Sequence, residues 1–489
     1  MQSNLRHTST HPTDRPTDRP TDRPTDRPPK PEPSSPPPQS TAKMRERDLR
    51  KQALESGKTV SRKARSKQPT PSSSRATSAT RSRVASREGS DDESELSDAT
   101  QWSNMSASID EMISPSAEEE QPAELWKDEV RSWIEGVVGL WKGKKASAQA
   151  REEVLQGFVQ GLARHFCQEE VGGGVKGEVL GSLVKSVRGG VTEKETVLAL
   201  KGLGLMVVTD PDEGVYDEIA GPVKGCVSDA QHPAAKAAAI HCLGVATFYG
   251  GASEEETAEV MEWMLDIVSS DGAVVGEEDN PDIVTAALEE WGFLATQIED
   301  LEDATEAAME TFVEQLDSGS VDVQIAAGDD IALVFEKSYT EAESDDEAPA
   351  SPEEDDEVNG HSGPRMIKRY DVTRNPAKLQ STLSSLSKES SKRLSKSDRK
   401  ALHLAFADIL NTVEKPTRGP RYSTALDPDG REYGSRLKIE VGGGGRMTID
   451  TWWKLHRLNA LKRLLREGFL VHYERNQVVF DTLPVIVEE

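Results

Sequence analysis

The side chains with the clearest chemistry are four cations in a short run near the N-terminus: Arg62, Lys63, Arg65 and Lys67. The sequence around them has few apolar residues, so we expect no packed core to hold them. Lys and Arg on such a segment neutralise phosphates and release counterions, which gives affinity for nucleic acid without sequence reading. The run predicts an RNA-binding or nuclear-localisation segment, and a solubilising tail is the alternative.

A second group of cations is predicted on one helix near the C-terminus. Residues 454–468, K-L-H-R-L-N-A-L-K-R-L-L-R-E-G, have apolar side chains at helical spacing. We expect the helix to present a cationic surface for nucleic acid, with His456 and Trp453 beside it; a solvated helix face is the alternative. The cations are Lys454, Arg457, Lys462, Arg463 and Arg466.

Motifs for catalysis are incomplete. Residues 172–177, G-G-G-V-K-G, match the dinucleotide-binding pattern in form, but they follow a predicted helix and not a strand. Two His–Cys pairs lack second halves at metal-ligand spacing: His165 with Cys167, and His241 with Cys242. Ser182-x-x-Lys185 is a lone match without companion motifs. We therefore expect a protein that is not an enzyme and uses no cofactor or metal.

Cysteine usage and hydropathy indicate the compartment. Three cysteines, Cys167, Cys226 and Cys242, are too few and too scattered for a disulfide framework, which favours a reducing environment. No apolar run approaches the ~20 residues of a membrane helix. We expect a protein of the cytoplasm, the nucleus or both, without membrane contact.

Charge is strongly segregated along the 489 residues, whose net charge is −27. Residues 121–340 contain 15 basic and 42 acidic side chains, whereas residues 44–88 contain 13 basic and 4 acidic ones. Residues 363–475 carry 24 basic and 12 acidic side chains. An acidic middle between two basic ends predicts separate partners for its parts: basic proteins for the middle and nucleic acid for the ends.

An internal repeat in the acidic middle positions these charges. Residues 199–205, 239–245, 287–293 and 327–333 share one pattern: Ala, usually an aliphatic residue, two variable residues, a large apolar residue, a small residue and an apolar residue. The offsets of 40, 48 and 40 residues are typical of armadillo and HEAT units. We predict four or five units, with a core at Ala199, Leu203, Gly204, Ala239, Leu243, Gly244, Ala287, Trp291, Gly292, Ala327, Ile331 and Ala332.

The fold class predicted from these patterns is mainly α: an armadillo- or HEAT-like α-solenoid with a small α+β C-terminal domain and a long disordered N-terminal tail. Residues 1–43 are disordered, either as a translated leader before a true initiator at Met44 or as a real tail. The other predicted parts are a basic then acidic tail (44–120), the repeats (121–340), an acidic linker (341–364), a basic linker (365–396) and a small C-terminal domain (397–489).

The combination resembles the interferon-related developmental regulator family. The resemblance rests on A-A-K-A-A-A-I-H-C-L-G-V-A-T-F (234–248), S-D-R-K-A-L-H-L-A-F-A-D-I-L (397–410) and the closing motif at 449–476. The family pattern of a Trp before a helix and Gly-x-x-x-His near its end matches Trp452 or Trp453, Gly468 and His472. The glycine-rich segment 442–445 departs from that pattern.

The resemblance implies a non-enzymatic regulator of gene expression. Family members act as transcriptional co-regulators through protein partners and as ribosome-associated repressors of translation. We expect an adaptor whose acidic solenoid binds proteins along its concave face and whose basic ends bind ribosomal RNA, restraining translation. The alternative is a nuclear co-regulator that bridges transcription factors to chromatin-modifying complexes. The residues leave the oligomeric state open.

Overall fold

The computed structural model describes residues 123–142, 146–342, 366–389, 394–420, 425–426, 432–433, 437–441 and 445–484, all within one compact unit, residues 90–489. The predictions for residues 1–120 and for most of the acidic linker lie outside these ranges. Among the described helices, none has the length and apolar character needed to cross a bilayer.

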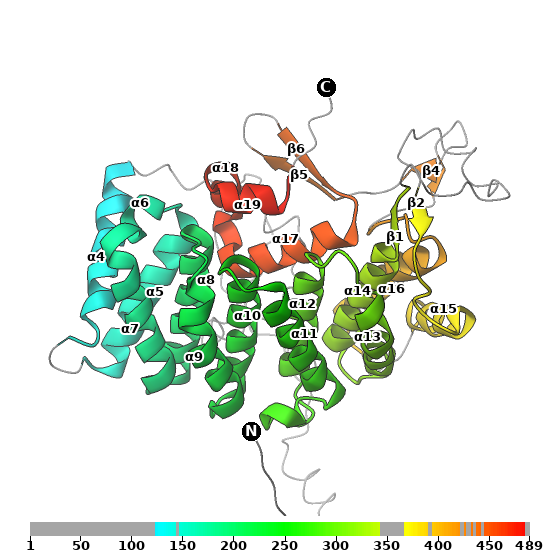
Figure 1. Ribbon diagram of the computed structural model, residues 1–489, viewed down its shortest axis with the longest axis horizontal. Coiled ribbons are helices and arrows are strands. Elements are labelled where there is room, and N and C mark those ends of the chain that lie inside the picture. The colour runs from blue at the N-terminus through cyan, green and yellow to red at the C-terminus, as the bar shows by residue number, and fades with distance from the viewer. Residues whose placement is uncertain are drawn as a thin grey trace, which may run out of the picture. The chain divides into compact units, whose positions relative to one another are not determined.

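Six helical pairs pack in series, which confirms the predicted α-solenoid (Figure 1). The second helices of the pairs pack on one another and form what we call the inner row; the first helices form the outer row. The pairs are α4 (Ala123–Gly139) with α5 (Ala148–Arg164), α7 (Lys176–Gly189) with α8 (Glu193–Thr209), α9 (Val215–Asp229) with α10 (Pro233–Tyr249), α11 (Glu254–Ser269) with α12 (Pro281–Ala295), α13 (Glu302–Gln315) with α14 (Val321–Lys337), and α15 (Pro376–Leu386) with α16 (Lys396–Glu414).

Local sequence starts these helices. The Ser253 hydroxyl accepts from the backbone of Glu256, whose side chain accepts from the Ser253 backbone, a capping box at the start of α11. Pro233 and Pro281 occupy the first turns of α10 and α12, where a missing N–H costs nothing. The offset of 48 residues in the repeat arises because a 3-10 turn, η2 (Ala273–Val275), lengthens the connection between α11 and α12.

The array extends beyond its predicted end at residue 340. Helices α15 and α16 form a sixth pair, and α16 packs on α14. Residues 376–386 are therefore part of the array and not of a basic linker, and the segment that follows the array begins after Glu414 instead of at residue 397. The strands on either side of the acidic linker form a two-stranded antiparallel sheet, in which β1 (Tyr339–Glu341) pairs with β2 (Met366–Lys368).

The C-terminal segment combines a hairpin with short helices. Strand β5 (Leu437–Val441) pairs antiparallel with β6 (Gly445–Ile449), and a two-residue pair joins β3 (Ala425–Leu426) to β4 (Glu432–Tyr433). Then follow α17 (Trp452–Leu465), a 3-10 turn η4 (Arg466–Gly468), α18 (Phe469–Arg475) and α19 (Gln477–Thr482). Helix α17 lies across the inner row (Figure 1).

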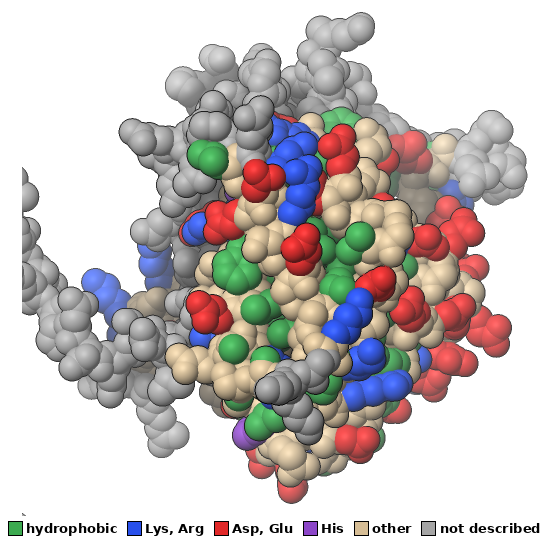
Figure 2. Space-filling view, turned by 90° about the vertical axis from the view of Figure 1, so that its left-hand side faces the viewer, with side chains coloured by type: hydrophobic (Ala, Val, Ile, Leu, Met, Phe, Trp, Pro, Cys, Tyr) green, Lys and Arg blue, Asp and Glu red, His purple; other side chains and the backbone are tan. Residues whose placement is uncertain are grey.

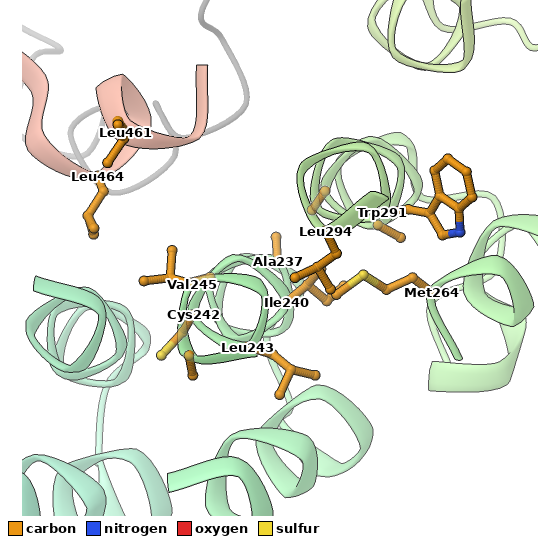
Figure 3. Close-up of a cluster of buried hydrophobic side chains, with 14 of the residues drawn as sticks. Ala237, Ile240, Cys242, Leu243, Val245, Met264, Trp291, Leu294, Leu461 and Leu464 are labelled. Carbon is orange, nitrogen blue, oxygen red and sulfur yellow. The ribbon is translucent and has the colours of Figure 1, made fainter. Parts of the chain in front are cut away.

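One continuous hydrophobic core includes buried side chains of the helical array and of the C-terminal segment. Figure 3 shows Ile240 of α10 beside Met264 of α11 and Leu294 of α12, and Val245 on the side of α10 that faces Leu464 of α17. Because the same cluster includes side chains of the array and of α17, the C-terminal segment is packed onto the solenoid and shares its core.

Candidate functional site: the α17 interface and the charged surfaces

Helix α17 runs along the inner row from α14 back toward α5. Its first residue lies at α14, where the Trp452 backbone N–H donates to Glu336. Its last turn lies at α8, where Leu464 is the nearest side chain to Gly204. Beyond it, η4 packs on α5. One helix therefore contacts α14, α12, α8 and α5.

The small residues of the repeat provide the space for α17 and its charged partners. A Cβ on Gly204 would lie 3.1 Å from Cδ1 of Leu464, tighter than ordinary contact. A Cβ on Gly292 would overlap His456 of α17 and Asp330 of α14, and one on Gly244 would overlap Glu290 of α12. The glycines of the repeat therefore leave room both for the next helix of the inner row and for α17.

A buried ion cluster joins α17 to α12 and α10. Arg463 Nη1 lies 2.9 Å from Glu289 Oε2, and its Nη2 contacts Glu290 Oε1. The same Glu290 oxygen lies 2.8 Å from His241 Nδ1 of α10. Arg463 is 5% exposed and Glu290 is fully buried. Burial raises the pKa of Glu290 to about 7, and Arg463 opposes the shift. Burial lowers the pKa of His241, with Arg463 adding to the effect.

A second polar contact joins α17 to α14. His456 Nε2 lies 3.8 Å from Asp330 Oδ1, and both side chains are buried. Burial raises the pKa of Asp330 well above its usual range and lowers the pKa of His456 to about 4. Burial thus disfavours the charged form of both groups, so this contact is less costly to the core than an isolated charge would be.

The N-terminus of α17 is capped by a side chain from the array. Glu336 of α14 accepts from the backbone N–H groups of Trp452 at 2.7 Å and Trp453 at 3.0 Å. These donors have no partner inside their own helix, so the Glu336 carboxyl oxygens satisfy them. Glu336 thus replaces a local cap and fixes where α17 begins.

The expectation of a cationic surface on this helix is wrong, because its cations face the array or their own helix. Lys462 and Arg463 are 2% and 5% exposed. Lys454 is 9% exposed and pairs with Asp450 at 2.7 Å. Arg457 is half-buried: it donates to Thr296 and lies over the Trp453 and Phe248 rings. Arg466, at the end of the helix, stays half-exposed.

The remaining candidate residues fall into two groups. Arg62, Lys63, Arg65 and Lys67 lie outside the described residues, so their role stays a prediction. The twelve repeat positions, from Ala199 to Ala332, are all buried.

The incomplete catalytic motifs form ordinary helical packing. Residues 173–175 form the 3-10 turn η1 after α6 (Gln168–Val171), and Ser182 is buried in α7. All three cysteines are free and buried, and burial raises the pKa of each thiol, so none is a ready thiolate. Within the described ranges, no three His, Cys, Asp or Glu side chains lie where they could share a metal ion.

The outer row carries the exposed negative charge. Helices α11 and α13 contain no Lys or Arg. Figure 2, seen from the α4 end of the array, shows acidic side chains gathered along one border. We call the ten exposed acids of these two helices the acidic outer face: Glu254, Glu255, Glu259, Glu262, Asp266, Glu302, Asp303, Glu306, Glu310 and Glu314.

The repeat pattern alone did not indicate which residues of the array are the partners of α17. Glu289-Glu290 and Asp329-Asp330 fill the two variable positions of the repeat in α12 and α14. Acidic pairs inside otherwise apolar helices were the available signal, because such helices rarely bury a charge without a partner. Glu336 carried no such signal, since it lies at the end of its helix.

These features define the class of the protein: an α-solenoid whose inner row is covered by its own C-terminal helix. The interferon-related developmental regulator family model matches residues 95–414, about two thirds of the chain. The chain belongs to this family of regulators, as its resemblance predicts. The match ends at the last residue of α16, so it spans the whole array.

Two relatives show the same extent of similarity. An uncharacterized protein of Schizosaccharomyces pombe is 27% identical over 380 residues, 77% of this chain and 79% of the relative. Interferon-related developmental regulator 1 of Homo sapiens is 21% identical over 372 residues, 72% of each chain. Both similarities extend over most of the chain and not over one motif.

Proposed function

We propose that the chain is a non-enzymatic regulator of gene expression that works as an adaptor on the ribosome and restrains translation. In this proposal the acidic outer face binds a basic protein, and the segment with Arg62, Lys63, Arg65 and Lys67 binds RNA. The observation that supports this proposal most directly is that acidic and basic side chains lie in separate parts of the chain. Helices α11 and α13 contain no Lys or Arg, whereas residues 44–88 have a large excess of them. Ribosomes present both basic proteins and RNA phosphate, which suits such a division.

We place the proposed protein-binding surface on the outer row and not on the inner row. The inner row, expected as the concave binding face, is covered over α8 to α14 by α17. Among the described residues, no helix lies across α11 and α13 in this way, and their ten exposed acids give a strong field for a basic partner. Repression would then act by occlusion: the adaptor binds with its outer face and its basic segment occupies a site that substrate RNA needs.

The test is co-sedimentation of the full chain with ribosomes through sucrose gradients at increasing salt, together with the yield of a translation reaction in vitro. Replacing Arg62, Lys63, Arg65 and Lys67 with Glu is expected to abolish co-sedimentation and repression. A control with two reversed charges replaces Lys185 and Arg188, exposed on α7, with Glu, and should leave both readouts unchanged. Equal co-sedimentation of both variants would refute the basic segment as the anchor.

A second variant tests the protein contact. Glu306→Lys with Glu310→Lys reverses two charges on the acidic outer face and is expected to weaken ribosome association while leaving binding to naked RNA intact. No change in ribosome association would remove the outer face from the proposal.

The nuclear co-regulator is the second candidate, and the same acidic outer face favours it, because histone tails are also basic. The two candidates separate on fractionation of nuclear and cytosolic extracts. Recovery with ribosomes supports the first, and recovery only with chromatin complexes supports the second and refutes the first.

A further inference from the structure

A cleft of about 250 Å³ opens where η4 meets α5 and α8. Its lining includes four cations, Arg164, Lys194, Lys201 and Arg466, and one acid, Glu467. In an array region with 42 acidic and 15 basic side chains, this is a local reversal of charge. A concave site lined by one sign of charge concentrates field and attracts ions of the opposite sign.

The cleft is formed by the docking of the C-terminal segment. Gly468 fits so closely over Ala163 of α5 that a Cβ would overlap its carbonyl oxygen. Arg466 has a φ of +50°, which turns the chain from α17 into η4 and brings its side chain to the cleft. The site thus combines residues that are about 300 positions apart in the sequence.

The lining has a polar rim and an apolar bottom. Val159, Val197 and Leu465 line the cleft and are buried, whereas Arg164 and Gln160 are exposed. Gln156 and Gln160 add two amides, each with donors and an acceptor. Within the described residues, neither Arg164 nor Lys194 forms an ion pair, although nearby Lys127 and Lys142 do.

From these features we infer that the cleft binds one unpaired nucleotide of an RNA strand. This inference rests on the proposed RNA binding and places a specific contact in the folded region. A base plane covers the apolar bottom, the amides bond to base edges, and the cations contact the flanking phosphates. The volume lies just below the roughly 300 Å³ at which pockets for larger ligands begin, which limits the occupant to about one nucleotide. A phosphoserine or phosphothreonine side chain would supply the negative charge but no ring to fill the apolar bottom.

The test is fluorescence anisotropy of the full chain with a labelled single-stranded RNA of about ten nucleotides, over a salt series. Arg164→Glu with Lys194→Glu is expected to weaken binding about tenfold or more and to reduce the salt slope by about 0.7 for each lost phosphate contact. Lys185→Glu with Arg188→Glu makes the same charge change on exposed α7 and should change affinity by less than about twofold. Since all four side chains are partly or fully exposed, both variants should fold, which circular dichroism verifies.

A cross-linking readout tests the apolar bottom. Photo-cross-linking with RNA that contains 4-thiouridine is expected to label peptides that include residues 156–160 or 194–198, and the cleft variant should lose this label. Equal affinity loss in both variants, or labels only elsewhere, would overturn the inference. So would binding of a phosphoserine peptide in the cleft without competition from RNA.

The inference and the proposed function fail in different ways. If the cleft variant binds RNA like the wild type while the Arg62, Lys63, Arg65 and Lys67 variant does not, the cleft is excluded and the proposed function stands. If the wild-type chain binds no RNA at low salt, both are refuted.

Discussion

At the scale of single residues, a buried ion cluster holds α17 on the array, and the loss of one charged member leaves another without its partner. Arg463 is nearly inaccessible, and its two partners, Glu289 and Glu290, belong to the array. Breaking a buried ion pair by removing one partner leaves the other charge without compensation in the core. Arg463 is therefore part of the protein's stability and not a contact for nucleic acid.

We expect Arg463→Met to lower the free energy of unfolding by about 3 to 5 kcal/mol, because Glu290 loses its cation. Adding Glu290→Gln should recover part of the loss, since the buried negative charge is then absent. Lys142→Met breaks the exposed pair with Glu178 and should have a much smaller effect, because water already solvates both charges. Urea unfolding of the four proteins measures this, and similar losses for Arg463→Met and Lys142→Met would contradict the assignment.

The glycines of the repeat give a second prediction. Gly292→Ala places a methyl group where Asp330 and His456 lie, so we expect a loss of about 1 to 3 kcal/mol from overpacking. Gly225→Ala adds the same group in open space on α9 and should stabilise by about 0.5 to 1 kcal/mol through helix propensity. Thermal unfolding compares the two, and a stabilising Gly292→Ala would show that α17 does not pack there.

At the scale of elements, α17 depends on the array for its own boundaries. Its N-cap, Thr451, makes no side-chain cap bond, and Glu336 of α14 supplies the acceptor instead. Its Arg463 and His456 side chains find partners on α12 and α14. An isolated helix of 14 residues is marginal in water, so most of the stability of α17 comes from this docking.

The cap predicts a dependence on pH. Burial raises the pKa of Glu336 to about 7 from 4.5, although its bonds to Trp452 and Trp453 oppose the shift. The folded carboxyl therefore keeps its proton up to about pH 7, whereas the unfolded one releases it near 4.5. This group's contribution to stability is present below about pH 4.5 and is lost as the pH rises to about 7.

Glu336→Gln removes that titration. We expect the stability difference between wild type and Glu336→Gln to shift by about 1 to 3 kcal/mol against the wild type between pH 4.5 and 7. Urea unfolding across this range measures the difference, in which the other titrating groups cancel. A difference that is independent of pH would exclude Glu336 as a buried cap.

At the scale of the whole molecule, the array could be predicted from the sequence, but the packing of α17 across its inner row could not. The period of the repeat and the placement of Ala199, Leu203 and Gly204 predict stacked helical pairs, because the pattern is local and recurs. The sixth helical pair was not predicted, because α15 and α16 lack the repeat pattern that begins with Ala and includes a small residue. The docking of α17 could not be read locally: a basic amphipathic helix looks the same on a surface as in a groove, and Arg463 meets Glu290 across 173 positions.

The packing of α17 across the inner row also limits where partners can bind. With the inner row covered by α17, the acidic outer face and the cleft beside η4 are two charged surfaces that stay accessible among the described residues. They carry opposite signs, so one chain offers separate contacts to a basic protein and to a polyanion.

The most direct test of this account is hydrogen exchange of the full chain, followed by mass spectrometry. If α17 is packed on the inner row in solution, its amides from Leu455 to Leu465 should exchange as slowly as those of α10 and α12. Exchange of α17 at the rate of an exposed helix, while α10 and α12 stay protected, would show that the helix is free and would return its cations to the list of nucleic-acid contacts.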